Sequence, residues 1–284
     1  MNHVLSTHLF VNHRLSTVWL GKMSHAGIDA VEIFCARQHL DYRNPAQVAE
    51  LGHWFRDSTM KLHSLHGPMY NDDVWGRSGP ASVVSITEPI KAKRITAVDE
   101  VKRALEVAET IPFRYLIQHV GAGGEEYDER KSDAAFNSLE EIALFAHQRG
   151  VQVLIENIPN SFSSAQRLVW FVNSTHLRVN FCFDVGHANM HEGVEAAYEL
   201  MKDRIRSTHL HDNDGKSDSH LFPFQAAGGT IDWTKTMRLL RSRPEQYPLV
   251  LELKEAAEVA DPFATAARIF EKLESLDAAP SNRD

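Results

Sequence analysis

The chain has 284 residues, of which 43% are hydrophobic and 24% charged, and its net charge is −8 at pH 7. This composition excludes global disorder, because it supplies enough apolar side chains for a large core. The acidic balance argues against non-specific nucleic-acid binding, and no apolar run approaches the ~18 residues that a membrane helix needs. Residues 1–10 lack the pattern of an export signal, and two cysteines make no disulfide framework, so we expect a cytoplasmic protein.

Short β-rich runs alternate with helical patterns along the chain. The strand candidates are Val4–Phe10, Ala30–Phe34, Lys61–His66, Tyr115–Val120, Val151–Asn157, Arg178–Asp184, Arg206–His211 and Pro248–Leu253. The clearest helical patterns lie at Lys91–Thr110, Asp133–Arg149, Ser164–Val172, Val194–Asp203, Trp233–Ser242 and Pro262–Leu276.

This alternation is typical of parallel strand–helix–strand units, and eight such units close most economically into a (β/α)8 TIM barrel. An open, doubly wound sheet is the alternative, but the first predicted strand lacks the Gly-x-Gly-x-x-Gly turn that such folds use. No linker divides the sequence. We therefore predict a single α/β barrel over residues 1–276 and a flexible tail over residues 277–284.

A long connection, Gly67–Pro89, follows the third predicted strand and contains several Gly, Pro and Asp residues. Connections of this length are usually functional or mobile, so we predict that it forms a lid over the barrel mouth. Within it, Trp75 is a candidate for stacking on a substrate ring.

Acidic and imidazole side chains occur at the ends of six consecutive predicted strands. Side chains alternate along a strand, and this alternation directs all six into the barrel at its carboxyl-terminal mouth, where barrel enzymes keep their catalytic residues. Six converging groups without matching Arg or Lys would remain underpaired, whereas a divalent metal would satisfy them as ligands. These residues are His66, His119, Glu156, Asp184, His209 and Glu252.

The connections beyond two strands add further candidate ligands. His187 follows Asp184 by three residues, and we expect Gly186 to give the backbone freedom to bend back toward the site. Asp218 and His220 are spaced to chelate one ion in an Asp- and Gly-containing loop.

The chain resembles the xylose-isomerase-like barrel superfamily, which holds sugar isomerases and epimerases together with AP endonucleases of the endonuclease-IV type. The resemblance covers essentially the full length, and seven motifs carry it. They are His66-Gly-Pro, His119-Val-Gly, Ile155-Glu-Asn, Phe183-Asp-Val-Gly-His, His209-Leu-His-Asp, Asp218-x-His220 and Leu251-Glu252.

The resemblance implies specific metal ligands. In the epimerases one metal is held by carboxylates of three strands and a strand-seven histidine, and these roles fall on Glu156, Asp184, His209 and Glu252. We prefer His209 to His211 because the family's ligand stands three residues before an acid. In the endonucleases three zinc ions use five more residues, which correspond to His66, His119, His187, Asp218 and His220. We therefore expect a divalent ion, Mn²⁺ or Zn²⁺, at one to three per chain.

Two chemistries fit these ligands. One metal ion would bind a keto sugar and acidify its C–H bond, while Glu156 and Glu252 act as acid and base through an enediolate. Three ions would instead generate a hydroxide that attacks a phosphodiester. The candidates for binding substrate are His187, His211, Trp75 and Lys216.

The acidic charge and the form of the loop after His209 favour the first chemistry. We predict an isomerase or epimerase of carbohydrate metabolism, acting on a sugar or sugar phosphate. A phosphodiesterase of the AP-endonuclease type and a lyase acting on a keto sugar or cyclitol are the alternatives. The expected partner is a small carbohydrate and not nucleic acid or a membrane, and the sequence leaves open whether the chain forms a homo-oligomer.

Overall fold

Eight parallel strands form the centre of the molecule in the computed structural model, which describes residues 1–225, 228–243 and 247–276. The strands are β1 (His3–Ser6), β2 (Ala30–Phe34), β3 (Lys61–His66), β4 (Tyr115–His119), β5 (Gln152–Glu156), β6 (Asn180–Asp184), β7 (Ile205–His209) and β8 (Leu249–Leu251). Neighbours in the sequence pair in order from β1 to β7, and β8 pairs with β1. A bridge between Leu210 and Leu251 joins the two remaining edges, so the predicted TIM barrel is confirmed.

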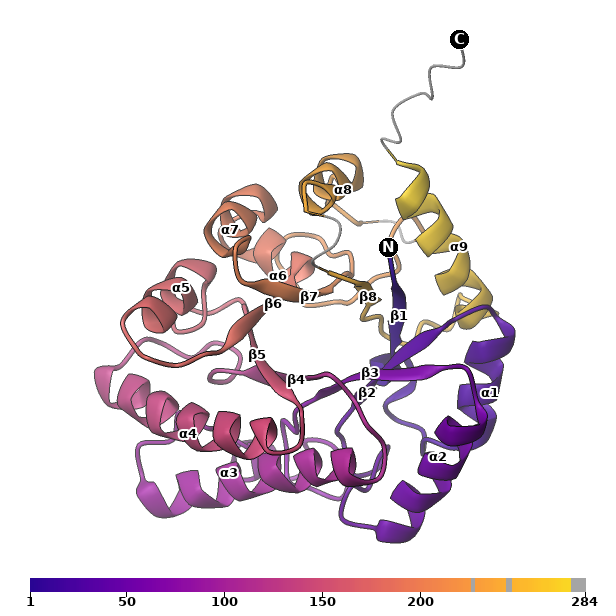
Figure 1. Ribbon diagram of the computed structural model, residues 1–284. Coiled ribbons are helices and arrows are strands. Elements are labelled where there is room, and N and C mark those ends of the chain that lie inside the picture. Colours follow the sequence, from indigo (N-terminus) through magenta and orange to yellow (C-terminus); the bar gives the residue numbers. More distant parts are fainter. Residues whose placement is uncertain (226–227, 244–246, 277–284) are drawn as a thin grey trace.

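Helices surround the strands on the outside of the barrel (Figure 1). The α-helices are α1 (Thr17–His25), α2 (Pro45–Asp57), α3 (Lys91–Leu105), α4 (Glu129–His147), α5 (Ala165–Asn173), α6 (Val185–Met190), α7 (Val194–Met201), α8 (Trp233–Arg241) and α9 (Pro262–Ser275). Within the described ranges, the short 3-10 helices are η1 (Thr7–Phe10), η2 (Gly79–Ser82) and η3 (Glu106–Glu109). Among the described residues, none of these helices is both long and apolar enough to cross a bilayer.

Strand alternation divides the apolar side chains into two sets, as predicted. Leu154 and Cys182 point inward and belong to a small cluster inside the barrel. Ile155 and Phe181 point outward into the large core between the strands and the helices. Complete burial of such a side chain contributes roughly 1.5–3 kcal/mol, so these neighbouring positions fix which residues of each strand face the barrel interior.

Several element boundaries differ from the prediction. The first strand ends at Ser6 instead of Phe10, because the Ser6 hydroxyl accepts the His8 N–H at 3.4 Å and caps η1. The fourth helix begins at Glu129 and not Asp133, since the Asp128 carboxylate accepts the first free N–H groups of α4. The predicted tail at 277–284 lies outside the described residues.

Two irregularities shift the strand register near the site. Pairing between β2 and β3 slips so that Glu32 lies opposite Ser64. Pairing between β6 and β7 slips so that Asp184 lies opposite His209; an unbroken register from Phe181 and Ile205 would have placed Thr208 there. Bulges of this kind re-aim side chains next to functional sites.

The segment Gly67–Pro89, predicted to be a lid, is bonded to the connection that follows β2. Tyr70 and Val83 form an antiparallel bridge within it. Arg37 donates to the Asn71 carbonyl at 3.2 Å and pairs with Asp73 at 2.8 Å. These contacts, which come from the chain beyond β2, hold the segment at the carboxyl-terminal end of the barrel.

Candidate metal centre

The six predicted residues meet at one end of the barrel. His66, His119, Glu156, Asp184 and His209 are the last residues of β3 to β7. Glu252 follows the last residue of β8 and is also buried. Parallel strands bring their carboxyl ends to the same mouth, and this explains how residues far apart in the sequence converge.

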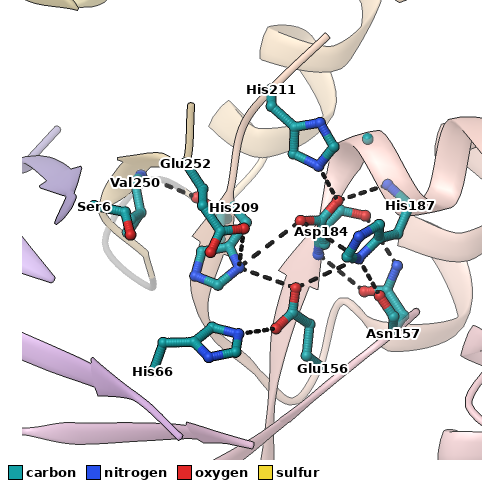
Figure 2. A network of polar contacts seen from close by, with 12 residues as sticks. Ser6, His66, Glu156, Asn157, Asp184, His187, His209, His211, Val250 and Glu252 are labelled. Atoms are coloured by element: carbon teal, nitrogen blue, oxygen red, sulfur yellow. Dashed lines mark hydrogen bonds and ion pairs between the residues drawn. The ribbon is translucent and has the colours of Figure 1, made fainter. Parts of the chain in front are cut away.

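Four of these residues, Glu156, Asp184, His209 and Glu252, form what we call the inner group. Each offers one ligand atom, and these atoms lie within 4.8 Å of one another. The Nδ1 atom of His209 lies 3.0 Å from Glu156 Oε1, 3.4 Å from Glu252 Oε2 and 3.8 Å from Asp184 Oδ2. Figure 2 shows His209 with the three carboxylates arranged around it.

Asp184 also makes structural hydrogen bonds, through one carboxylate oxygen and through its backbone. Its Oδ1 atom accepts the His187 N–H at 2.6 Å and caps α6. Asn157 bonds both the N–H and the carbonyl of Asp184, each at 2.9 Å, which fixes the backbone at the strand end. The Oδ2 atom is left buried without a hydrogen-bond partner.

The second group, which we call the histidine-pair group, consists of His66, His119 and Glu156. Glu156 Oε2 lies 3.5 Å from His66 Nε2 and 3.1 Å from His119 Nε2. The two imidazole nitrogens are 3.3 Å apart. Glu156 therefore faces the inner group with one oxygen and the histidine pair with the other.

The third group, which we call the outer group, consists of His187, His211, Asp218 and His220. Backbone carbonyls orient two of its rings: His187 Nδ1 lies 3.0 Å from the Asn157 oxygen, and His220 Nδ1 lies 2.9 Å from the Glu252 oxygen. A proton on each Nδ1 leaves both Nε2 atoms free as ligands. These Nε2 atoms face Asp218, at 3.4 Å and 3.1 Å.

The loop after β7 is built to present Asp218 and His220. Asp212 and Leu221 exchange backbone hydrogen bonds at 2.9 and 2.8 Å, which closes the loop between them. The buried Asp212 carboxylate also accepts the indole N–H of Trp233 at 2.8 Å. His220 has a φ of +46°, a left-handed conformation that is rare outside glycine and clusters at functional sites.

His211 occupies space that a glycine makes available. Its ring is fully buried and stacks on His220 with centroids 3.8 Å apart, and its Nε2 lies 3.2 Å from Asp184 Oδ1. A Cβ at Gly186 would lie only 2.1 Å from the His211 ring. Gly186 sits inside α6 with an ordinary negative φ, so the expectation that it supplies backbone freedom is wrong. The site instead requires a residue without a Cβ at this position, because a Cβ would overlap the His211 ring.

The electrostatics of the mouth pair acids with imidazoles. Burial would raise the pKa of Glu156, but the charges of His209 and His119 hold it well below its ordinary value. Burial would lower the pKa of His220, yet its bonds to Asp218 raise that pKa to about 9. Without a cation, protons on the histidines thus balance the carboxylates, and a bound cation would displace them.

The donor set fits divalent metal. All nine predicted ligands fall into the three groups, and His211 is added to the outer one. Glu156 Oε2 and Asp184 Oδ2 are buried without hydrogen-bond partners, which is costly unless a cation satisfies them. Mixed imidazole and carboxylate ligands are those that Zn²⁺ and Mn²⁺ accept.

An aromatic wall borders the histidine-pair group. Phe34 stacks on His66 at 4.3 Å, and Trp75 lies 5.2 Å from Phe34 and 5.8 Å from His8, measured between ring centroids. Trp75 thus comes close to the predicted ligands, whereas Lys216 is exposed in the loop beyond β7.

Phe34 is not among the site residues predicted from the sequence. Its position at the end of β2 is the signal that could have identified it.

Comparison with known proteins identifies the family of this chain. The sequence profile of the xylose isomerase-like TIM barrel family matches residues 20–276. The chain belongs to this family. Among curated relatives, the y4fM protein of Sinorhizobium fredii is 25% identical over 64% of the chain and 63% of its own length. The MJ1614 protein of Methanocaldococcus jannaschii is 29% identical over 45% of the chain and 51% of its own length, so the match spans only part of these relatives.

Several solved structures share the fold of this xylose isomerase-like chain. A D-tagatose 3-epimerase-like protein has a TM-score of 0.76 and 22% identity, with 96% of both chains covered. The IolI protein, solved with a zinc atom, has a TM-score of 0.72 and 16% identity over 96% of both chains. A D-psicose 3-epimerase solved with D-fructose has a TM-score of 0.70 and 15% identity, with 95% of this chain and 90% of its own covered. At these identities the likeness establishes the shared fold.

Proposed function

We propose that this protein is a metal-dependent isomerase or epimerase that acts on a sugar or sugar phosphate. The observation that carries the proposal is the inner group. Two buried glutamates, Glu156 and Glu252, both approach Nδ1 of His209, at 3.0 and 3.4 Å, from different strands of the barrel. Sugar epimerases among the structures of the same fold support it.

The inner group would hold one divalent ion, Mn²⁺ or Zn²⁺, through Glu156, Asp184, His209 and Glu252. When bound there, the ion supplies Lewis-acid polarisation of a carbonyl and its neighbouring hydroxyl. The histidine-pair and outer groups give the chain a capacity for up to three ions.

The two glutamates are the proposed acid and base. One carboxylate removes the proton from the carbon next to the carbonyl, and the other returns a proton to the opposite face, which inverts the configuration. The low pKa of Glu156 keeps it ionised, as a base must be at neutral pH. Both residues are 2% exposed or less, which keeps bulk water away from the reacting carbon, and the glutamates exchange their protons with solvent between turnovers.

The remaining predicted residues have proposed roles around the sugar. His187 and His211 line the outer side of the site and can bond hydroxyl groups. Trp75 and the segment Gly67–Pro89 would cover the apolar face of the substrate from the side of β3. Lys216, exposed beyond β7, would reach a phosphate on a phosphorylated sugar.

Exchange of a substrate proton with deuterated solvent tests the proposal directly. The protein, loaded with Mn²⁺, is incubated with D-fructose, D-psicose, D-tagatose and their phosphates, and deuterium at the carbon next to the carbonyl is followed by NMR. Glu156→Gln and Glu252→Gln should abolish exchange, whereas Glu258→Gln, which changes an exposed glutamate beyond β8, should leave it intact. Exchange that persists in both site variants would refute the assigned roles.

A phosphodiesterase of the AP-endonuclease type is the second candidate, because all nine residues of a three-ion centre are present and grouped. A duplex containing one abasic site is the substrate that distinguishes the two. The net charge of −8 leads us to expect little cleavage, since phosphate contacts dominate such binding. Efficient cleavage at moderate salt, without proton exchange on any sugar, would favour this second function.

A further inference from the structure

A buried carboxylate stands behind the inner group, on the side of His209 away from the other acids. Glu32 points inward from β2 and is completely buried. His209 Nε2 lies 3.0 Å from Glu32 Oε1 and 3.2 Å from Oε2. The opposite ring nitrogen, Nδ1, is the atom that faces Glu156, Asp184 and Glu252.

Glu32 is itself held in place by a neighbouring strand. The Ser64 hydroxyl donates to Glu32 Oε2 at 2.7 Å, and Ser64 is fully buried. The two residues lie opposite each other only because the register of β2 and β3 slips between Val31 and Glu32. The register slip and the Ser64 hydroxyl thus hold the Glu32 carboxylate against the His209 ring.

We propose that Glu32 is a positioning residue: it holds the proton of His209 on Nε2 and so makes Nδ1 the metal-binding nitrogen of the inner group. The inference rests on the proposed metal centre. Neutral imidazole has one donor and one acceptor nitrogen, and a carboxylate accepts only, so the proton must lie on the nitrogen that faces Glu32 when the other binds a cation. The carboxylate also fixes the ring plane and increases the basicity of Nδ1.

This role differs from that of the nearby ligands. Glu32 does not belong to any of the three ligand groups among the described residues, and a histidine lies between it and the inner carboxylates. Its removal should therefore weaken binding of the ion without deleting a ligand. The ligands of the histidine-pair and outer groups stay the same in such a variant.

Metal titration of the full chain tests the proposal without any substrate. Metal is removed with a chelator, and binding of Zn²⁺ and then of Mn²⁺ is measured by calorimetry. Because the loss of such a partner typically costs 10–100-fold in affinity, Glu32→Ala should weaken binding at the inner group about 100-fold and Glu32→Gln about 10-fold. Glutamine keeps an oxygen for the Nε2 proton but loses the charge, and this explains the smaller effect.

A second carboxylate provides the matched control. Glu100 is also buried, and it bonds Tyr42 and Arg43, so Glu100→Gln removes a buried carboxylate that does not bond His209. Its metal affinity should equal that of the unmodified chain. Nitrogen-15 spectra of the zinc-loaded protein should show the His209 proton on Nε2, which a merely structural role of Glu32 would not require.

The outcomes separate this inference from the proposed function. Zinc affinity in Glu32→Gln equal to that of the unmodified chain, or a His209 proton on Nδ1, would overturn the role of Glu32 alone. If Glu32→Ala does not fold, the nearly isosteric Glu32→Gln variant and the nitrogen spectra decide. Absence of tight metal binding in the unmodified chain would overturn both, whereas metal binding without sugar exchange would overturn only the assigned reaction.

Discussion

Replacing Gly186 with alanine should destabilise the metal-free protein, although alanine is the better helix former. Gly186 lies in α6 beneath His211, and an added Cβ would meet three ring atoms at 2.1, 2.4 and 2.5 Å. Carbon atoms in contact prefer about 3.5–4.0 Å, so the ring would have to move by roughly 1.4 Å. The His211 ring has little free space to move into, because it is fully buried and stacked on His220 at 3.8 Å.

The size of the effect follows from two opposing contributions. Overpacking a buried site costs typically about 1–3 kcal/mol, whereas Gly→Ala within a helix gains up to about 1 kcal/mol. Gly21 in α1 provides the control, since nothing lies within 4 Å of a Cβ built there. Both substitutions share the helix contribution, so Gly186→Ala should be less stable than Gly21→Ala by about 1–3 kcal/mol.

Thermal unfolding followed by circular dichroism measures this difference. At about 2 °C per kcal/mol for a domain of this size, the Gly186→Ala midpoint should lie several degrees below that of Gly21→Ala. Adding His211→Ala should remove most of the penalty, because the two sites are in contact and their effects are not additive. A Gly186→Ala midpoint equal to or above that of Gly21→Ala would refute the packing argument.

Three further predictions follow from the site and its surroundings. Combining His66→Ala with His119→Ala should lower the metal content by one ion and leave the inner ion bound; unchanged stoichiometry by elemental analysis would leave these histidines a substrate-binding or structural role. Shortening 67–89 should reduce turnover far more than metal content, and normal turnover would show that the segment is only a surface connection. His39, whose pKa burial lowers to about 4, must stay neutral in the folded state, so its contribution to stability should be lost as the pH falls from about 6.5 toward 4. Urea unfolding should show that His39→Asn loses less unfolding free energy than the unmodified protein as the pH falls over this range. Equal losses in the two proteins would refute this.

Much of the barrel could be predicted because the signals are local. A strand that alternates between two apolar faces and ends in a charged residue places that residue at the mouth without further information. Asp184 shows this most clearly, since it ends its strand as predicted. The end of the first strand was predicted too late because the cap provided by Ser6 competes with extension of the strand.

The relations across the barrel could not be predicted in this way. Glu32 and His209 meet from β2 and β7, which are not neighbours in the sheet, and both positions depend on register slips that leave no clear mark in the sequence. The need for Gly186 likewise depends on a ring 25 residues away in the chain. Such contacts are determined by barrel closure, which the pattern of a single strand does not contain.

Glu156 presents its two oxygens to two different groups, and this has a thermodynamic consequence for the proposed centre. A cation at one oxygen withdraws electron density from the other and fixes the torsion of the shared side chain. Occupancy of the inner group and of the histidine pair is therefore linked, and the linkage is reciprocal: each ion changes the affinity for the other by the same factor. Metal titrations of this chain should accordingly show cooperativity between these two ions, and the outer ion should bind as a more independent unit.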